Sequence, residues 1–357
     1  MPHYYTILSI VSKKKIKDKT FNCQKQDLIM KYRGVYFLII ILLAFLFPAD
    51  AHVPVLVDDN ENIENAVLIE DPLKSWALYD ELDAGEVHYY RFFMNKGQSL
   101  SISLFVPKTD EFTPSLAIMG PGIRSNTRPI FLEIPGDSGV LILEGELPGD
   151  AIYEPFTPTS HYKLAEIALN IEEAGTYYVA VYDQDTGGRY GLAIGSREEF
   201  ELLEWIMVPF NVIRIHKWEG QSLAFILSPT ILVVIIGLFF IYRKKRSLGF
   251  FSIIGSFAGL LYMGSGAAML IQMFIALSSA SFTLSVFLTL VFVLVSILVG
   301  IAILHISFQD DVNNKARGKM VILGIIGLFA WAGILIGPLS AIIAGILPSD
   351  DKINKIK

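Results

Sequence analysis

Four long runs of apolar residues in the second half of the chain constrain its fold more than any other feature. None of the four contains Asp, Glu, Lys or Arg. A helix needs about 20 apolar residues to cross the hydrocarbon core of a bilayer. We therefore predict an all-α bundle of four transmembrane helices within residues 221–347, followed by a short tail at 348–357. The predicted helices cover approximately residues 223–242, 250–276, 282–306 and 320–347.

The basic residues between these runs predict how the bundle is oriented. The loop 243–249 contains "RKKR", and the loop 307–319 contains Lys315, Arg317 and Lys319, whereas the intervening loop has no basic residue. Basic loops stay in the cytoplasm. We therefore expect a multi-pass protein of the cell membrane, with loops 243–249 and 307–319 cytoplasmic and residues 52–220 extracytoplasmic. Three lysines in the tail, which would then lie outside, are a weak contrary signal.

The N-terminal region contains a predicted signal peptide at residues 30–51, "MKYRGVYFLIIILLAFLFPADA". A basic start, a short apolar run and a small-x-small motif are typical of a secretory signal, here cleaved after Ala51. An uncleaved anchor is the alternative. Residues 1–29 precede this signal and its own methionine, so we interpret them as a mis-annotated or disordered extension.

Composition excludes some classes of protein. The net charge of −6 argues against a nucleic-acid partner, since such proteins need a basic face. The only cysteine is Cys23, so the chain cannot form an internal disulfide. The region 52–195 must therefore be stabilised by its own core.

Short alternating runs separated by turn residues predict that residues 52–195 form an antiparallel β-sandwich. In "SLSISLFVP", Leu100, Ile102, Leu104 and Val106 alternate with the residues between them. A period of two is typical of a strand with one buried face. Turn signals recur throughout this region, which favours a sandwich.

Two segments carry a resemblance to a known family. "LDAGEVHYYRFFMNKGQSLSISLFVP" and "EEAGTYYVAVYDQDTGGRYGLAIG" resemble the opening and closing hairpins of the bacterial and archaeal pre-peptidase C-terminal (PPC-like) domain. The resemblance covers about residues 53–195. It implies a jelly-roll-like β-sandwich, often a binding or accessory module of secreted and surface proteins, and it implies no catalytic residue. Relatives usually sit beside a catalytic domain, and this sequence shows none.

Two acidic runs in this region are candidate calcium ligands, because calcium prefers carboxylate oxygens. They supply Asp58, Asp59, Glu61, Asp183 and Asp185. Neither run fits an EF-hand loop, and solvated acidic loops are the alternative. No other cofactor is expected, and the sequence has no Gly-x-Ser-x-Gly, His-Glu-x-x-His or phosphate-loop motif, so we expect no enzyme activity.

A copper site is a second possible metal centre. Cleavage after Ala51 would make His52 the N-terminal residue, which can bind copper through its amino group and ring with help from His88. Neither histidine has metal-ligand spacing, so ordinary structural histidines are the alternative.

The strands also carry many aromatic residues. An outward-facing set could bind glycan or protein, and the alternative is that they fill the core. The set comprises Tyr89, Tyr90, Phe92, Phe93, Tyr177, Tyr178, Tyr182 and Tyr190.

Residues 196–220 are predicted to form an amphipathic juxtamembrane helix. Ser196 and Glu199 have capping-box spacing, and Pro209 should break or kink the helix. The helix could lie on the membrane surface or pack on the β domain.

Small residues in the membrane region predict close helix packing, through Gly255 and Gly259 in one run and Gly333 and Gly337 in another. Homo-oligomerisation through one such face is possible. The spans lack ionisable residues, which argues against an autonomous transporter. We therefore expect a non-enzymatic binding or sensing module outside the membrane. The alternatives are an accessory subunit of a transport or assembly complex and a calcium- or copper-binding envelope protein.

Overall fold

The structure is a computed structural model that describes residues 52–108, 112–125, 127–136, 138–244, 249–309 and 312–347. The predicted signal peptide, the N-terminal extension and the C-terminal tail lie outside the described residues. The β domain and the helices that follow it belong to one compact unit, Ala49–Lys357.

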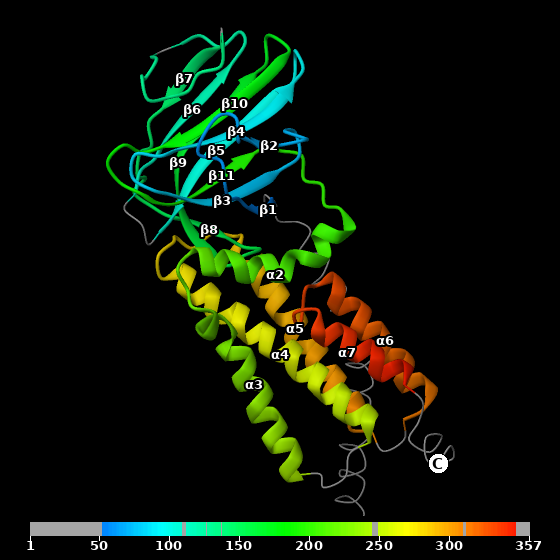
Figure 1. Ribbon diagram of the computed structural model, residues 1–357. Coiled ribbons are helices and arrows are strands. Elements are labelled where there is room, and N and C mark those ends of the chain that lie inside the picture. Colours follow the sequence, from blue (N-terminus) through cyan, green and yellow to red (C-terminus); the bar gives the residue numbers. More distant parts are fainter. Residues whose placement is uncertain are drawn as a thin grey trace, which may run out of the picture. The chain divides into compact units, whose positions relative to one another are not determined.

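The β domain consists of two sheets (Figure 1). Most neighbouring strands are antiparallel, but β1 pairs with β3, and β2 with β4, in parallel. The six-stranded sheet has the order β1 (Val53–Leu56), β3 (Trp76–Leu82), β11 (Gly188–Ile194), β5 (Ser99–Pro107), β9 (Thr159–Asn170) and β8 (Ile152–Glu154). The five-stranded sheet has the order β2 (Val67–Leu68), β4 (Val87–Met94), β10 (Gly175–Tyr182), β6 (Ser115–Gly120) and β7 (Gly139–Leu143).

The main core lies between the two sheets, and β5 shows why. Leu100, Ile102, Leu104 and Val106 are fully buried in it. The alternate positions point away from the core, because successive side chains of a strand project to opposite faces. The predicted β-sandwich is confirmed.

Most aromatic residues of the strands are core residues. Tyr90, Phe92 and Tyr190 lie between the sheets. Tyr89 and Tyr182 lie on the other face of the five-stranded sheet, in a second buried cluster with Leu132. The loop that contains Leu132 covers this face, and the backbone N–H of Glu133 donates to the Tyr89 hydroxyl at 2.9 Å. Among these aromatic residues Phe93 is clearly exposed.

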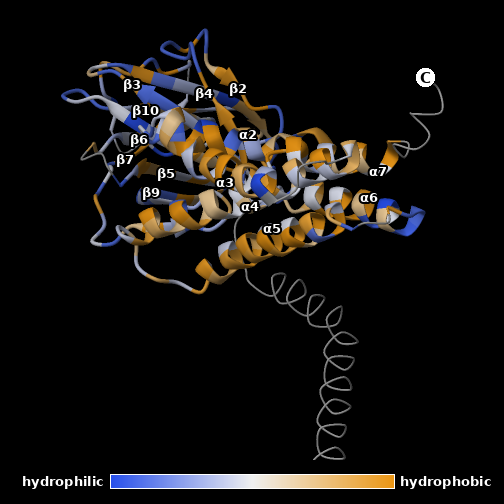
Figure 2. Ribbon diagram, turned by 90° about the horizontal axis from the view of Figure 1, so that it is seen from below, coloured by the Kyte–Doolittle hydropathy of each residue, from blue (hydrophilic) through white to orange (hydrophobic). Residues whose placement is uncertain are grey.

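Six helices follow the sandwich in the described part of the chain. Three of them are long and apolar enough to cross a membrane, and Figure 2 shows the hydrophobic colour along most of α5. The helices are α2 (Leu202–Trp218), α3 (Leu223–Lys244), α4 (Phe250–Leu277), α5 (Val286–Ser307), α6 (Asn314–Phe329) and α7 (Ile336–Ile346).

The prediction that residues 320–347 form a fourth spanning helix was wrong. This run forms α6 and α7, joined by a turn in which Trp331, Gly333, Ile334 and Leu335 have positive φ. The two helices are antiparallel, because Gly345 near the end of α7 packs on Arg317 and Val321 near the start of α6. We call residues 314–346 the C-terminal hairpin. The Gly-Pro pair at 337–338 was the overlooked signal, since proline is favoured in the first turn of a helix and is costly in its interior.

The juxtamembrane helix α2 begins later than its capping-box spacing predicted. Its N-cap is Glu201, whose backbone N–H donates to the Glu204 side chain at 2.8 Å, and Ser196 and Glu199 precede it. The helix also continues through Pro209. Proline lacks the N–H that would bond to the Trp205 carbonyl four residues earlier. The indole Nε1 of Trp331 donates to that carbonyl instead, at 3.0 Å.

The glycines of the membrane region lie at helix contacts within the chain. On α4, Gly255 faces Ser307 of α5, and Gly259 faces the Gly300 carbonyl. Gly333 lies in the hairpin turn and Gly337 in the first turn of α7, and both pack against the Tyr262 ring of α4. Small residues allow this close approach of helices.

Candidate functional site

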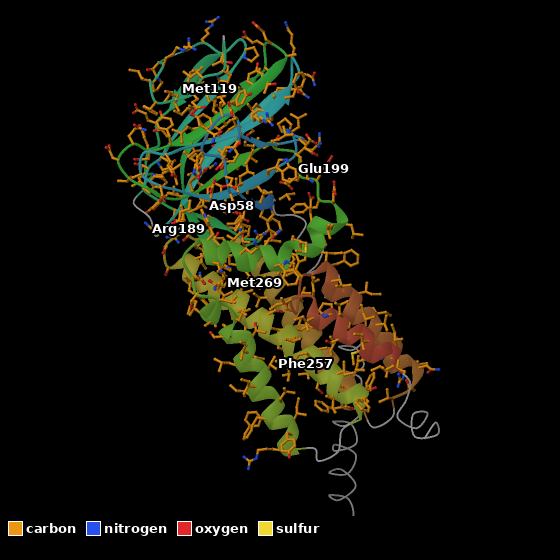
Figure 3. All side chains as sticks on the ribbon, viewed as in Figure 1. Asp58, Met119, Arg189, Glu199, Phe257 and Met269 are labelled. Carbon is orange, nitrogen blue, oxygen red and sulfur yellow. The ribbon has the colours of Figure 1, made fainter. Side chains whose placement is uncertain are left out.

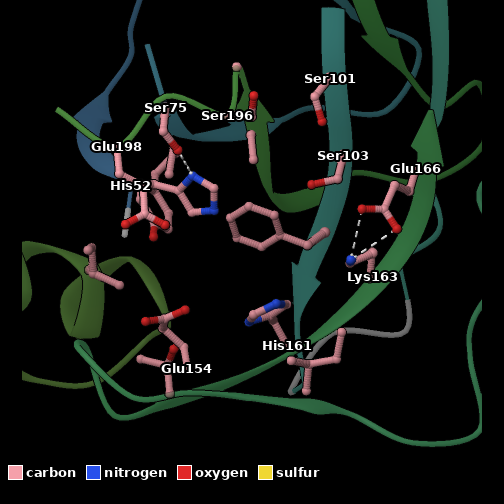
Figure 4. A pocket seen from close by; sticks show the side chains of 18 of the residues that line it. His52, Ser75, Ser101, Ser103, Glu154, His161, Lys163, Glu166, Ser196 and Glu198 are labelled. Carbon is pink, nitrogen blue, oxygen red and sulfur yellow. Dashed lines mark hydrogen bonds and ion pairs between the residues drawn. The ribbon is translucent and has the colours of Figure 1, made fainter. Parts of the chain in front are cut away.

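A cavity of about 230 Å³ lies between the outer face of the six-stranded sheet and helix α2 (Figure 4). We call it the sheet–helix cleft. The floor of its sheet side is made of small residues, which leave room above the strands between larger side chains such as Tyr79 and Phe105. These small residues are Ala77, Ser101, Ser103, Ala193 and Gly195. Its helix side is formed by Ile215, Trp218 and Glu219. The cleft therefore exists because the outward positions of β3, β5 and β11 are small where α2 crosses the sheet.

Polar side chains surround this floor of small residues. His52, just before β1, forms a hydrogen bond with Ser75 (Figure 4). Lys163 and Glu166 on β9 form an ion pair at 3.1 Å. Three further carboxylates line the cleft, those of Glu154, Glu198 and Glu219. Among the described residues that line the cleft, Lys163 is the only lysine or arginine, whereas four are glutamates. The lining therefore carries more negative than positive charge.

His161 lies at the inner wall of the cleft, with its ring 4.9 Å from that of Phe105. Burial, and then the neighbouring Lys163 and His52, lower the pKa of His161 to about 4. The imidazole is therefore neutral near pH 7, when one ring nitrogen donates a hydrogen bond and the other accepts one.

Helix α2 is held at both ends by polar contacts with the sandwich. Near its start, Glu204 forms an ion pair with Lys74 at 2.7 Å. At its end, the Trp218 Nε1 donates to the Asp80 carbonyl at 2.9 Å, and Arg189 donates to the Trp218 carbonyl at 2.8 Å. Between these ends, α2 is joined to the C-terminal hairpin through Trp205 and Trp331.

The turn of the C-terminal hairpin lies at the junction of sandwich and helices. The Trp331 ring stacks on Phe292 of α5, with centroids 5.5 Å apart, and lies 4.5 Å from that of Trp205. It also lies near Phe156 of the β8–β9 loop. Beside it, the Tyr153 hydroxyl bonds to Thr289 at 2.7 Å, and Thr289 donates to the Pro155 carbonyl. The sandwich thus contacts α2, α5 and the hairpin directly.

A buried polar network lies between the two sheets and joins side chains of β3, β4 and β11. One carboxylate oxygen of Asp80, Oδ2, is 2.9 Å from His88 Nδ1 and accepts from the hydroxyls of Tyr90 and Tyr190, each at 3.1 Å. The two hydroxyls are 2.7 Å apart. Burial raises the pKa of both tyrosines well above the usual value, so they remain protonated donors.

The structure places the proposed copper ligands in different surroundings. His52 lines the sheet–helix cleft, whereas His88 is bonded to Asp80 in the core. Within the described ranges, no group of three or more His, Cys, Asp or Glu side chains is arranged to hold a metal ion. The lack of metal-ligand spacing between the two histidines in the sequence agrees with these separate environments.

The proposed calcium ligands lie in two loops. Asp58, Asp59 and Glu61 follow β1, and Figure 3 labels Asp58 there. Asp183 and Asp185 follow β10, where Asp183 Oδ1 accepts from the backbone N–H groups of Asp185 and Thr186 at 2.9 and 2.8 Å. This bonding explains the acidic residue as part of a turn.

Comparison with known proteins gives fold-level similarities only. No family model matches the chain, and no curated protein matches it. Among solved structures, it is similar to PliG of Aeromonas hydrophila, a periplasmic inhibitor of g-type lysozyme, with 14% identity and a TM-score of 0.22, covering 41% of this chain and 98% of that one. It is also similar to a pre-peptidase C-terminal domain of a Bacillus anthracis collagenase, with 15% identity and a TM-score of 0.21, covering 41% and 95%.

Proposed function

We propose that this chain is a non-enzymatic membrane protein whose β domain binds a ligand outside the cytoplasm, in the sheet–helix cleft. The observation that carries the proposal is the position of the cleft. Its lining combines polar side chains of the sandwich with Ile215, Trp218 and Glu219 of α2. The same helix contacts the C-terminal hairpin through Trp205 and Trp331, so a bound ligand would touch the element that joins sandwich to membrane helices.

The lining favours a ligand that carries positive charge and donates hydrogen bonds. Glu154, Glu198 and Glu219 provide carboxylates, and Ser101 and Ser103 provide hydroxyls. Aromatic rings beside carboxylates attract organic cations, and Tyr79 and Trp218 meet edge to face at 4.9 Å in this wall. Amino sugars, polyamines and basic peptides share this chemistry.

Filling the cleft should abolish binding. We expect a panel of amino sugars, polyamines and basic peptides to contain compounds that change the tryptophan fluorescence of a full-length protein in which Trp76, Trp205 and Trp331 are replaced by Phe, so that Trp218 is the reporter. Ser103→Phe places a ring over the floor of the cleft and should remove the response. Ser99→Phe, an exposed position on the same face of β5, should retain it. A response that persists in Ser103→Phe would place the ligand elsewhere.

We further propose that the sandwich is extracytoplasmic and that the chain crosses the membrane three times. The support is the arrangement of the basic segments. Helix α4 runs antiparallel to both α3 and α5, so the α3–α4 and α5–α6 connections lie at the same end of these helices. Arg317 at the start of α6 donates to the Leu347 carbonyl at the end of α7. The lysine-containing tail then begins at the same end as both basic loops, which removes the contrary signal noted in the sequence.

Cysteine labelling tests this topology in a Cys23→Ser background. We expect Ser279→Cys, between α4 and α5, to react with an impermeant maleimide in right-side-out vesicles. Asn314→Cys and Ile346→Cys, at the two ends of the C-terminal hairpin, should react only after permeabilisation. Labelling of Ile346→Cys together with Ser279→Cys would show a fourth crossing and overturn the three-span topology.

A further inference from the structure

A second cavity, of about 90 Å³, lies on the opposite side of α2 from the sheet–helix cleft. It is bounded by α2, α3, α4 and the turn of the C-terminal hairpin, and we call it the interhelical cavity. Figure 3 labels Met269, one of the α4 residues that line it. Most of the lining is apolar, including Ile226, Leu227 and Ala268. Such a lining fits a hydrocarbon chain.

One polar group in this lining lacks a partner. Thr230 of α3 is 5% exposed, and its hydroxyl forms no hydrogen bond with any described residue. A buried polar group without a partner is costly, and such groups in native proteins usually mark an unseen partner. A ligand with a hydrogen-bond acceptor at this position would satisfy the hydroxyl.

The rim of the cavity on α2 is basic. Pro209, Ile213 and His216 face the cavity. The residues one position further along the helix, Phe210, Arg214 and Lys217, are exposed. Within the described part of the chain, neither Arg214 nor Lys217 forms an ion pair or a side-chain hydrogen bond, so an anionic group could bind both.

The depth of the cavity matches the boundary between membrane and water. Ile226, Leu227 and Thr230 lie within the first eight residues of the apolar helix α3, which begins at Leu223. At a rise of about 1.5 Å per residue, they lie roughly 5–10 Å inside that end. Gln221, two residues before the start of α3, and Gln272 of α4 exchange amide hydrogen bonds of 2.9 and 2.7 Å at that end of the helix. Lipid ester groups occupy this boundary, between headgroup and hydrocarbon.

We propose that the interhelical cavity and the basic rim of α2 bind one anionic phospholipid. Its phosphate pairs with Arg214 and Lys217. An ester oxygen accepts the hydrogen bond of Thr230, and an acyl chain enters the apolar space between α3 and α4. This site is separate from the sheet–helix cleft and needs no ligand there.

Native mass spectrometry of the delipidated full-length protein in detergent tests the site. Palmitoyl-oleoyl-phosphatidylglycerol is compared with the phosphatidylcholine of the same chains. We expect one molecule of the anionic lipid to bind at least tenfold more tightly than the zwitterionic one. Arg214→Ala and Lys217→Ala should each weaken the anionic lipid about fivefold and weaken the zwitterionic lipid less, because its choline cation already offsets the charge of the phosphate.

Controls separate the site from general attraction to charge. Lys96→Ala and Arg124→Ala remove exposed basic residues of the β domain and should not change binding. Ala268→Phe should fill the cavity and remove tight binding of both lipids. Thr230→Val has nearly the same shape, so it tests the cavity even if Ala268→Phe does not fold, and should weaken binding severalfold. Equal affinity for the two lipids, or binding unchanged by Thr230→Val, would overturn the proposal.

Discussion

Replacing Asp80 with Asn should lower the free energy of unfolding of the β domain by about 3 kcal/mol. The Asp80 carboxylate is 8% exposed and is bonded to His88, Tyr90 and Tyr190 through one oxygen. Removing one charged member of a buried, hydrogen-bonded group is strongly destabilising, because the remaining polar groups stay buried without their partner. Thermal unfolding of the full-length protein in detergent should show a fall of roughly 10 °C in the transition of the β domain.

Asp185→Asn is the matched control for this effect. Asp185 is exposed, and its own carboxylate takes part in no hydrogen bond with a described residue. It should shift the transition by less than about 0.5 kcal/mol, as surface substitutions usually do. An Asp80→Asn protein as stable as wild type would mean that Asp80 is not the acceptor on which the network depends.

Replacing Gly327 with Ala should prevent the C-terminal hairpin from docking on α4. A Cβ at Gly327 would overlap the hydroxyl of Tyr262, which also donates to the carbonyls of Leu323 and Gly324 at 3.2 and 3.4 Å. The Tyr262 ring is held between α6 and α7, so it cannot move aside. Overpacking of this kind costs about 1–3 kcal/mol or more. We expect a lower melting temperature and faster proteolysis of the hairpin.

Two variants make this result specific. Gly318→Ala, also in α6, meets no atom within 4 Å and should be neutral or stabilising by up to about 1 kcal/mol, as expected for Gly to Ala in a helix. Tyr262→Leu should recover much of the loss in the Gly327→Ala background, because it removes the group that is overlapped. Equal effects of Gly327→Ala and Gly318→Ala would contradict the described packing.

The sequence predicted the regular elements well because their periodicity is strong. The strand Ser99–Pro107 begins and ends where the alternation of apolar residues placed it. The helix from Phe250 to Leu277 differs by one residue from its uncharged run. Each of these elements buries one face or all of its side chains, so its apolar residues recur regularly or continuously in the sequence.

The hairpin turn and the cleft were not predicted, because both depend on contacts between distant residues. Hydropathy alone cannot distinguish one apolar helix of 28 residues from two shorter helices that form an antiparallel hairpin. The break between the two helices depends on Gly333 and Pro338. Pro209 was expected to interrupt its helix, but the partner that completes the backbone bonding, Trp331, lies 126 residues from Trp205. The small residues of the cleft floor come from three strands that are far apart in the sequence. No pattern within one strand shows that they will lie side by side.

Helix α2 has a cavity on each side of its C-terminal half, and both of its ends are bonded to the sandwich. Ile215 lines the sheet–helix cleft, and the next residue, His216, lines the interhelical cavity. Occupants of the two cavities would therefore act on the same few turns of helix. Thermodynamic linkage makes such an effect reciprocal. If an anionic lipid raises the affinity of the cleft for its ligand by some factor, the cleft ligand must raise the affinity for that lipid by the same factor. The lipid composition of the bilayer would then set how sensitively the β domain responds to its ligand.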